Sequence, residues 1–134
     1  MSNIVIGWDN PEHTVVHLTL HPGWTWPELY EINTTIIEMM SSTDQTVHLL
    51  LDTTLINSVP MGGVITHARN ILGAYPPNCD MRILVTRNML IQRLGSIFQS
   101  TFRADLGKHL HTVSSIEAAY RLIDKKASAQ GELS

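Results

Sequence analysis

A polar loop between two apolar segments holds the residues of this chain whose types and spacing favour phosphate chemistry. The stretch Leu49–Ala68 leaves an apolar segment at Asp52, passes Ser58 and enters a second apolar segment. A helix that begins near Pro60 or Met61 would present unpaired backbone amides and the positive end of its dipole, which stabilise an exposed phosphate by up to ~1 kcal/mol. Ser58 is therefore the candidate phosphoacceptor.

The same loop has a structural interpretation and a binding interpretation. In the first, the side chain of Asn57 or Ser58 caps the following helix, and two glycines allow close approach to a sheet. In the second, the loop contacts a partner, because a methionine at an exposed helix start adapts to varied apolar surfaces. The candidate partner-binding loop comprises Asn57, Ser58, Met61, Gly62 and Gly63.

Two catalytic interpretations of this loop fit less well. Asp52, at the end of an apolar run, resembles the phosphorylated aspartate of a two-component receiver. However, Asp9 leads into a turn where a receiver has a helix, and Pro60 follows Asp52 at too great a distance. Arg87 stands where a receiver has lysine. The glycine pair matches neither a dinucleotide fingerprint nor a phosphate-binding loop, so no nucleotide is expected.

Three histidines recur at a spacing that a metal site would use. His13, His17 and His21 are four residues apart and would share one face of a straight strand. A turn before the strand and a proline after it place the outer two beyond its ends. No acid or cysteine follows at ligand spacing. We therefore expect no metal and no cofactor, with His17 beside a polar neighbour on a solvated sheet face and His67 on a helix surface.

Two tryptophans directly precede the first predicted helix. Trp24 is expected to pack back onto that helix as a hydrophobic staple. Trp26 is expected to stay free as an aromatic anchor for a ligand or partner, since large rigid rings lose little entropy on burial. One residue separates the two, which disfavours burial of both against the same surface.

Composition and the lack of catalytic motifs predict a cytoplasmic globular protein. The 134 residues suffice for one core, and 43% hydrophobic with 16% charged residues is typical of a globular chain. The net charge of −3, with dispersed Lys and Arg, excludes nucleic acid and anionic membranes as expected partners. The single cysteine excludes an internal disulfide, and no apolar run is long enough to cross a membrane. A nucleophile elbow and paired carboxylates are both lacking, so we predict no enzymatic activity.

Hydrophobic periodicity predicts nine elements in the order β-β-α-β-α-β-α-β-α. Alternating or continuous apolar runs give strands at 3–8, 14–20, 46–52, 81–86 and 109–113, the first two forming a hairpin. Helical spacing gives four inner faces: Leu29, Ile32, Ile36, Met39 and Met40; Val64, Ala68, Ile71 and Leu72; Leu90, Leu94, Ile97 and Phe98; Ile116, Ala119, Tyr120 and Ile123. Capping boxes are expected at Thr25 with Glu28 and at Ser114 with Glu117.

This order implies a single α/β domain over residues 1–126, with a mixed, mostly parallel sheet and a frayed tail at 127–134. The element order and a Ser-Gly-Gly-bearing loop after the third strand resemble the STAS fold of anti-sigma-factor antagonists. In that family a kinase phosphorylates a serine of an Asp-Ser-Ser-Gly loop. Here Asn57 and Ser58 stand at the Asp-Ser position and Val59 replaces the second serine, so the phosphoswitch is degenerate.

The resemblance implies a non-enzymatic regulatory domain that binds a protein partner, an anti-sigma factor or a kinase-like regulator. Two alternatives stay open. Looser relatives of the fold accommodate apolar ligands, which would make the chain a small-molecule or lipid-binding domain. A structural homo-oligomer, with a homodimer as its simplest form, is the other alternative.

Overall fold

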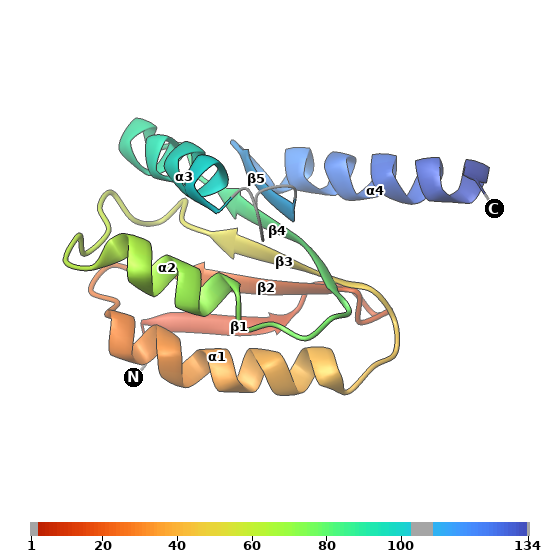
Figure 1. Cartoon of the computed structure of the whole chain (residues 1–134), viewed down its shortest axis with the longest axis horizontal. Helices are drawn as coiled ribbons and strands as arrows, with labels where there is room; N and C mark the ends of the chain where they lie inside the picture. Colours follow the sequence, from red (N-terminus) through yellow and green to blue (C-terminus); the bar gives the residue numbers. More distant parts are fainter. Residues whose placement is uncertain (1–2, 103–108, 134) are drawn as a thin grey trace.

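A computed structural model describes residues 3–102 and 109–133, with the side chains of residues 127–133 excepted. It contains the nine elements in the predicted order (Figure 1). The strands are β1 (Ile4–Trp8), β2 (Val15–Leu20), β3 (Val47–Asp52), β4 (Cys79–Val85) and β5 (Leu110–Val113). The helices are α1 (Trp26–Ser41), α2 (Val64–Leu72), α3 (Met89–Thr101) and α4 (Ile116–Leu133).

The five strands form one mixed sheet in the order β1-β2-β3-β4-β5. β1 and β2 are antiparallel, as the short turn between them requires, and the other neighbouring pairs are parallel. The prediction of a mostly parallel α/β sheet with an N-terminal hairpin is therefore confirmed.

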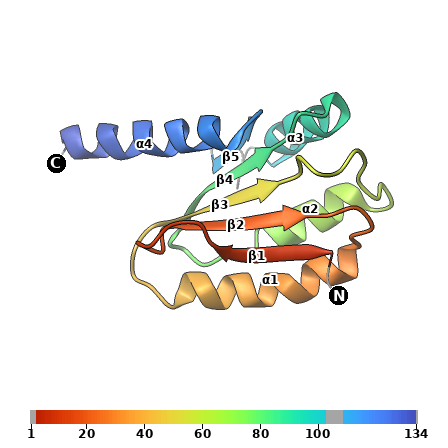
Figure 2. The ribbon, with the colours of Figure 1, turned by 180° about the vertical axis from the view of Figure 1, so that it is seen from behind.

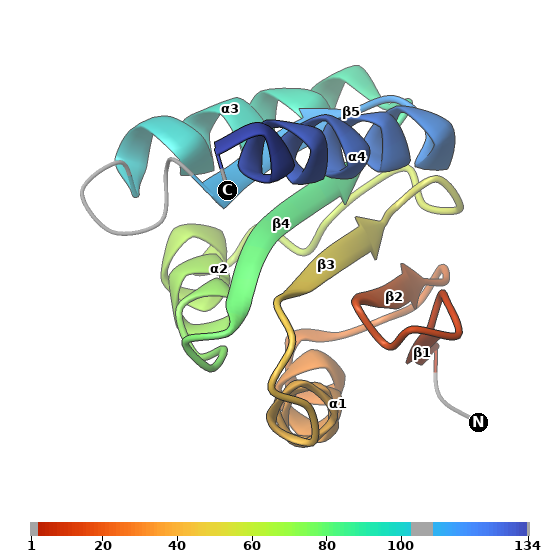
Figure 3. The ribbon, with the colours of Figure 1, turned by 90° about the vertical axis from the view of Figure 1, so that its right-hand side faces the viewer.

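The helices cover the two faces of the sheet unequally. Each parallel connection moves one strand further in the same direction, so crossovers of the usual right hand put their helices on one face. α1, α2 and α3 follow that face, and α4 lies on the other (Figure 3). α4 contacts β3, β4 and β5, and Val15 at the start of β2 belongs to the core beneath it (Figure 2).

Strand alternation produces two apolar cores. On β3, Val47 and Leu49 face α1 and α2, whereas Leu50 faces α4. The larger core lies between the sheet and α1 to α3, and the smaller lies under α4 around Ala119 and Ile123. Both sides of the central strands are thus buried, as their nearly continuous apolar runs predict.

The helix starts show which local predictions were correct. α1 has the predicted capping box, in which Thr25 and Glu28 each accept a hydrogen bond from the other's backbone amide. The second predicted box, at Ser114 and Glu117, is wrong by one residue. Ser115 accepts from the Ala118 amide at 3.0 Å, so α4 begins at Ile116.

The predicted inner face of α3 is partly wrong. Leu90 and Ile97 are exposed, and the buried positions are Ile91 and Gly95, with Leu94 and Phe98 half-buried. Gly95 allows α3 to come close to β5. The prediction used the spacing of apolar side chains, so it did not mark this glycine as a buried position. The face of α3 that packs on the sheet is therefore centred on Ile91 and Gly95 and not on Leu90 and Ile97.

α4 continues as a helix to Leu133. The side chains of residues 127–133, and residue 134 as a whole, lie outside the described part of the structure. The predicted fraying of residues 127–134 therefore stays a prediction.

Candidate functional site: the carboxyl edge of the sheet

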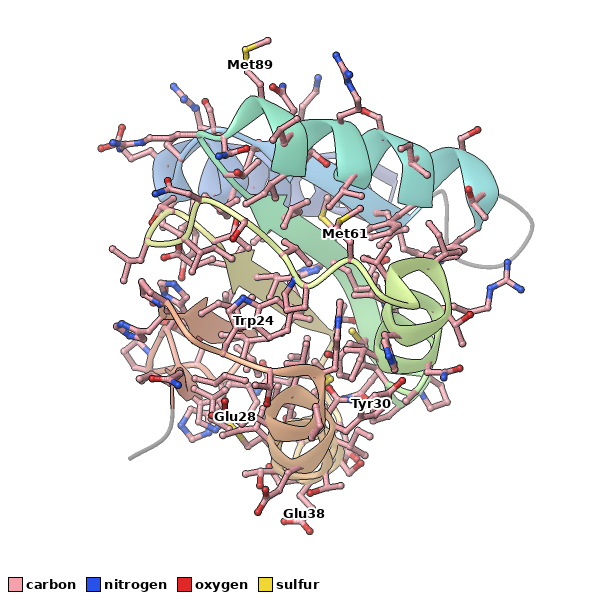
Figure 4. All side chains as sticks on the ribbon, turned by 90° about the vertical axis from the view of Figure 1, so that its left-hand side faces the viewer. Trp24, Glu28, Tyr30, Glu38, Met61 and Met89 are labelled. Carbon is pink, nitrogen blue, oxygen red and sulfur yellow. The ribbon has the colours of Figure 1, made fainter. Side chains whose placement is uncertain are left out.

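The loops that leave β2, β3 and β4 meet at one edge of the sheet, where parallel strands all end (Figure 4). Loops at the carboxyl edge of a parallel sheet are the usual place for binding residues. The longest of them joins β3 to α2 over residues 53–63 and contains the five residues of the candidate partner-binding loop.

This β3–α2 loop is held by contacts along its length. Thr53 donates from its backbone amide and its hydroxyl to the carbonyl of Val85, at 2.9 and 2.7 Å. Ile56 is buried in the larger core. Further on, the side-chain amide of Asn88 donates to the Asn57 carbonyl at 3.1 Å. The loop thus joins the start of α3 to the core of the sheet.

α1 fixes the second half of the loop through Trp26. The Trp26 indole nitrogen donates to the Pro60 carbonyl at 2.9 Å, and the indole ring stacks on His67 with centroids 5.0 Å apart. Trp26 is consequently half-buried, with its polar atom already engaged. Trp26 thus holds the loop against α1 and α2. Its role as an anchor for a partner stays a prediction.

His67 is not the plain surface residue that the sequence analysis predicted. The Tyr30 hydroxyl lies 2.8 Å from His67 Nδ1 and accepts from Asn70 at 3.2 Å. A hydroxyl has one proton and two lone pairs, so it can accept from Asn70 and either donate to or accept from Nδ1, according to the tautomer of His67. His67 thereby connects α1 and α2 directly below the loop.

The predicted start of α2 near Pro60 or Met61 is wrong. The helix begins at Val64, with Gly63 as its N-cap and no side chain capping it. Neither Asn57 nor Ser58 is a cap, and Ser58 lies five residues before the N-cap, so the first-turn amides are not adjacent to it along the chain. Ser58 is exposed, and its role as phosphoacceptor stays a prediction.

The two glycines of the loop were expected to allow close approach to the sheet, and neither does so. Gly63 has a φ of 68°, in the left-handed region that glycine adopts at little cost. A Cβ on Gly63 would meet His67 at 3.3 Å, whereas one on Gly62 would meet nothing within 4 Å. Gly63 is therefore needed for the turn into α2, and Gly62 is exposed and unconstrained.

Asp52 is engaged in a polar network at the end of β3. Its Oδ1 accepts from the amide and hydroxyl of Thr54 at 2.9 and 2.7 Å, and its Oδ2 lies 2.9 Å from His17 Nε2. Burial opposes ionisation, but the hydrogen bonds from Thr54 and His17 outweigh it, so the pKa of Asp52 is lowered. Both carboxylate oxygens of Asp52 thus take part in hydrogen bonds within the domain.

His17 lies beside polar neighbours on the sheet face, as predicted, and bridges two acids. Its Nδ1 is 3.0 Å from Asp9, which also accepts a hydrogen bond from Tyr120 on α4. His13 instead stacks on Trp8, with centroids 4.6 Å apart. Within residues 3–102 and 109–126, histidines, cysteines and acids form no group that would hold a metal.

Six large apolar side chains are exposed among the described residues, and only Met61 was expected from the sequence to be at the surface. They are Val5, Leu55, Met61, Met89, Leu90 and Ile97. Apart from Val5, all lie on the β3–α2 loop or on α3. In Figure 4, Met61 lies in the middle of the carboxyl edge and Met89 projects from the start of α3. The helical spacing of Leu90 and Ile97 is visible in the sequence, but it predicts a buried face and not an exposed one.

No helix in the described part of the chain is both long and apolar enough to cross a membrane. The fold and the site define a small α/β domain with an apolar carboxyl edge. Comparison with known proteins found no matching family model, no matching curated protein and no matching solved structure.

Proposed function

We propose that the chain is a non-enzymatic regulatory domain that binds a protein partner at its carboxyl-edge surface, defined here as Leu55, Met61, Met89 and Leu90. One observation carries this proposal. Of the six large apolar side chains exposed among the described residues, only Val5 lies outside the β3–α2 loop and α3. Exposed apolar side chains that gather on one region are typical of interaction sites, and methionines adapt to varied partner surfaces.

The charged residues near this surface favour an acidic partner. Between residues 53 and 102 the only acid is Asp80, which lies at the opposite end of β4 and pairs with Lys126 and His109. Arg87 and Arg93 are exposed beside Met89 and Leu90. An acidic segment that carries apolar side chains complements this surface, although the chain as a whole has a net charge of −3.

The anchored loop supports binding without prior folding. Trp26 and Asn88 hold Pro60 and Asn57 through hydrogen bonds of 2.9 and 3.1 Å. A partner therefore meets a loop that is already ordered, so little conformational entropy is lost on binding.

Ser58 supplies a regulatory form of this proposal. Its side chain is exposed on the same loop, and the nearest acid in the sequence is Asp52, whose carboxylate is engaged with Thr54 and His17. A phosphate would add a charge of about −1.5 to −2 there. Phosphorylation would thus repel an acidic partner, which is the direction expected of a switch that releases its partner. The resemblance to STAS antagonists, with an anti-sigma or kinase-like regulator as partner, remains part of this proposal.

The test compares matched charge substitutions on two faces. Met61→Asp places a charge in the carboxyl-edge surface, and Val5→Asp places the same charge on an equally exposed residue of β1, since the exposed fractions are 60% and 54%. Met61→Leu is the conservative control. Tagged proteins would be used for quantitative affinity capture from the native lysate, and thermal melting would establish that each variant is folded.

The proposal requires a protein that Val5→Asp and Met61→Leu retain and that Met61→Asp loses. With that partner purified, Met61→Asp should weaken binding about tenfold or more, as at a central interface residue. Arg87→Glu should slow association and reduce its dependence on salt. Equal capture by the Met61→Asp and Val5→Asp variants would contradict the proposal.

A further inference from the structure

Behind the candidate partner-binding loop, the larger core contains an unfilled apolar cavity of about 80 Å³. Its lining comes from the start of α1, from α2 and α3, and from the inner faces of β3, β4 and β5. Ala68, Ile71, Leu94 and Phe98 are among these residues, and their side chains offer no polar partner. An apolar cavity of this kind stays dry and takes up small apolar molecules.

A wider groove of about 420 Å³ lies on the outer side of the same region. The β2–α1 loop lines it at Pro22 and Gly23, and the β3–α2 loop lines it from Leu55 to Pro60. Trp24 and Val59 line both the groove and the inner cavity. These two side chains therefore form the boundary between an apolar interior and an open, more polar entrance.

Trp24 has an unsatisfied donor at this boundary. Its side chain is 5% exposed, and no acceptor among the described residues takes the hydrogen bond from its indole nitrogen. A buried donor without a partner is costly, so such atoms in native proteins call for an explanation. In Figure 4, Trp24 lies between the β3–α2 loop and the start of α1.

Trp26 provides a contrast within the same structure. The two rings are in edge contact with centroids 4.8 Å apart, and both line the inner cavity, contrary to the expectation that they would not share a surface. Trp26 donates to Pro60, so its hydrogen-bonding capacity is used. Of the two indoles, Trp24 is the one whose N–H is buried and has no acceptor among the described residues.

We propose that the groove and the inner cavity together form a binding site for a small neutral molecule with a short aliphatic chain and one carbonyl group. The carbonyl oxygen accepts the hydrogen bond from Trp24 Nε1. The aliphatic chain enters the inner cavity between α2, α3 and the sheet, and the remaining polar part stays in the groove beside Asn57 and Ser58.

The lining determines this ligand class. None of the described residues that line the groove is charged, so a carboxylate there would lack a counter-ion from them, which favours a ketone, ester or amide. Arg82 lines the inner cavity, but it donates to the carbonyls of Leu72, Cys79 and Asp80. The inner volume is about half of the ~150 Å³ that accommodates benzene, so it suits a narrow chain and not a ring.

The ligand site and the carboxyl-edge surface share Leu55, which lines the groove, but they can be tested separately. Met61, Met89 and Leu90 line neither cavity, so the Met61→Asp experiment tests the partner surface and leaves the residues of the ligand site unchanged. A failed capture experiment would leave the ligand proposal standing. Likewise, a failed ligand titration would leave the partner proposal standing.

The test follows the indole N–H resonances of the folded, full-length protein by nuclear magnetic resonance during titration with 2-pentanone. Trp24→Phe and Trp26→Phe variants assign the signals. We expect a saturable downfield shift of the Trp24 signal as its hydrogen bond forms, and a smaller change for Trp26. Xenon, which has no acceptor, should enter the inner cavity without this downfield shift. Butanoate, which is charged, should bind more weakly than the ketone.

Two variants separate the carbonyl contact from the cavity. Trp24→Phe should weaken binding of 2-pentanone by about three- to tenfold while xenon still binds, because only the ketone uses the indole donor. Ala68→Val fills the inner cavity and should abolish binding of both probes, with thermal melting used to establish that the variant is folded.

Two outcomes would overturn the proposal. One is no saturable shift of the Trp24 signal up to the solubility limit of the ketone. The other is a bound water at the Trp24 indole, seen as a magnetisation transfer from water that 2-pentanone does not displace. In that case a solvent molecule satisfies the donor and the cavity is only a packing defect.

Discussion

Gly95 on α3 offers a sharp test of the packing, because it lies where the helix comes closest to the sheet. A Cβ added at this position would lie 2.4 Å from Thr112 Oγ1 and 2.9 Å from Leu84 Cδ2. Both distances are shorter than real Cβ contacts. Gly95→Ala must therefore move α3 away from β5 or force Thr112 and Leu84 into other rotamers.

Two opposing effects set the size of the change in stability. Overpacking a buried contact costs about 1–3 kcal/mol. Alanine in a helix interior gains about 0.5–1 kcal/mol over glycine. Their difference predicts that Gly95→Ala lowers the free energy of unfolding by roughly 0–2.5 kcal/mol.

Urea unfolding followed by circular dichroism would measure this difference. Gly7→Ala is the control, because a Cβ there meets nothing within 4 Å, and it should leave the protein equally stable or slightly more stable. Thr112→Ala removes the hydroxyl oxygen that the new methyl group meets. In the Gly95→Ala background this second change should recover part of the loss, which a double-mutant cycle would report. If Gly95→Ala instead stabilised the protein by the full helix-propensity gain, the close approach of α3 to β5 would be refuted.

Three further predictions concern stability and reactivity. Thr25→Ala removes one half of the α1 capping box and should cost about 1 kcal/mol in urea unfolding, whereas Thr25→Ser should cost little; equal losses would show that the cap hydroxyl is unimportant. Burial lowers the pKa of His48 and of His111. The unfolded chain therefore binds protons that the folded one does not, so stability should fall as the pH drops below about 6.5, and less so in the His48→Gln variant. A free energy of unfolding that stays constant from neutral pH down to the onset of acid unfolding would contradict this prediction. Burial raises the pKa of Cys79 to about 11, so a thiol reagent at mildly alkaline pH should label the protein only after unfolding, and rapid labelling of the folded protein would disprove the burial.

Sequence patterns were sufficient for the architecture because the elements satisfy strong local rules. The run 47–52 supplies apolar side chains to both cores, and Thr25 with Glu28 forms the predicted cap. The four predicted inner-face residues of α2 are all buried. Each of these features depends on neighbours within one element, so periodicity and capping chemistry reveal it directly.

Features that depend on contacts between distant segments were not predictable in this way. His17 meets Asp52, 35 residues away, and Tyr30 meets His67, 37 residues away. A sequence pattern does not show which neighbouring strand or helix brings such groups together. The exposure of Leu90 has the same origin, because the approach of Gly95 to Thr112 decides which face of α3 is buried.

The strand order has a consequence for how the chain folds. Every strand pairs with its neighbour in the sequence, so no pairing has to wait for a distant part of the chain. The hairpin closes the shortest loop, with Ile6 opposite Leu18, whereas Leu50 and Ile83 are 33 residues apart. Since the entropy of loop closure and the folding rate both depend on sequence separation, assembly should begin at the hairpin and add one strand with its helix at a time. α4, which closes the second face last, would then complete the cooperative unit.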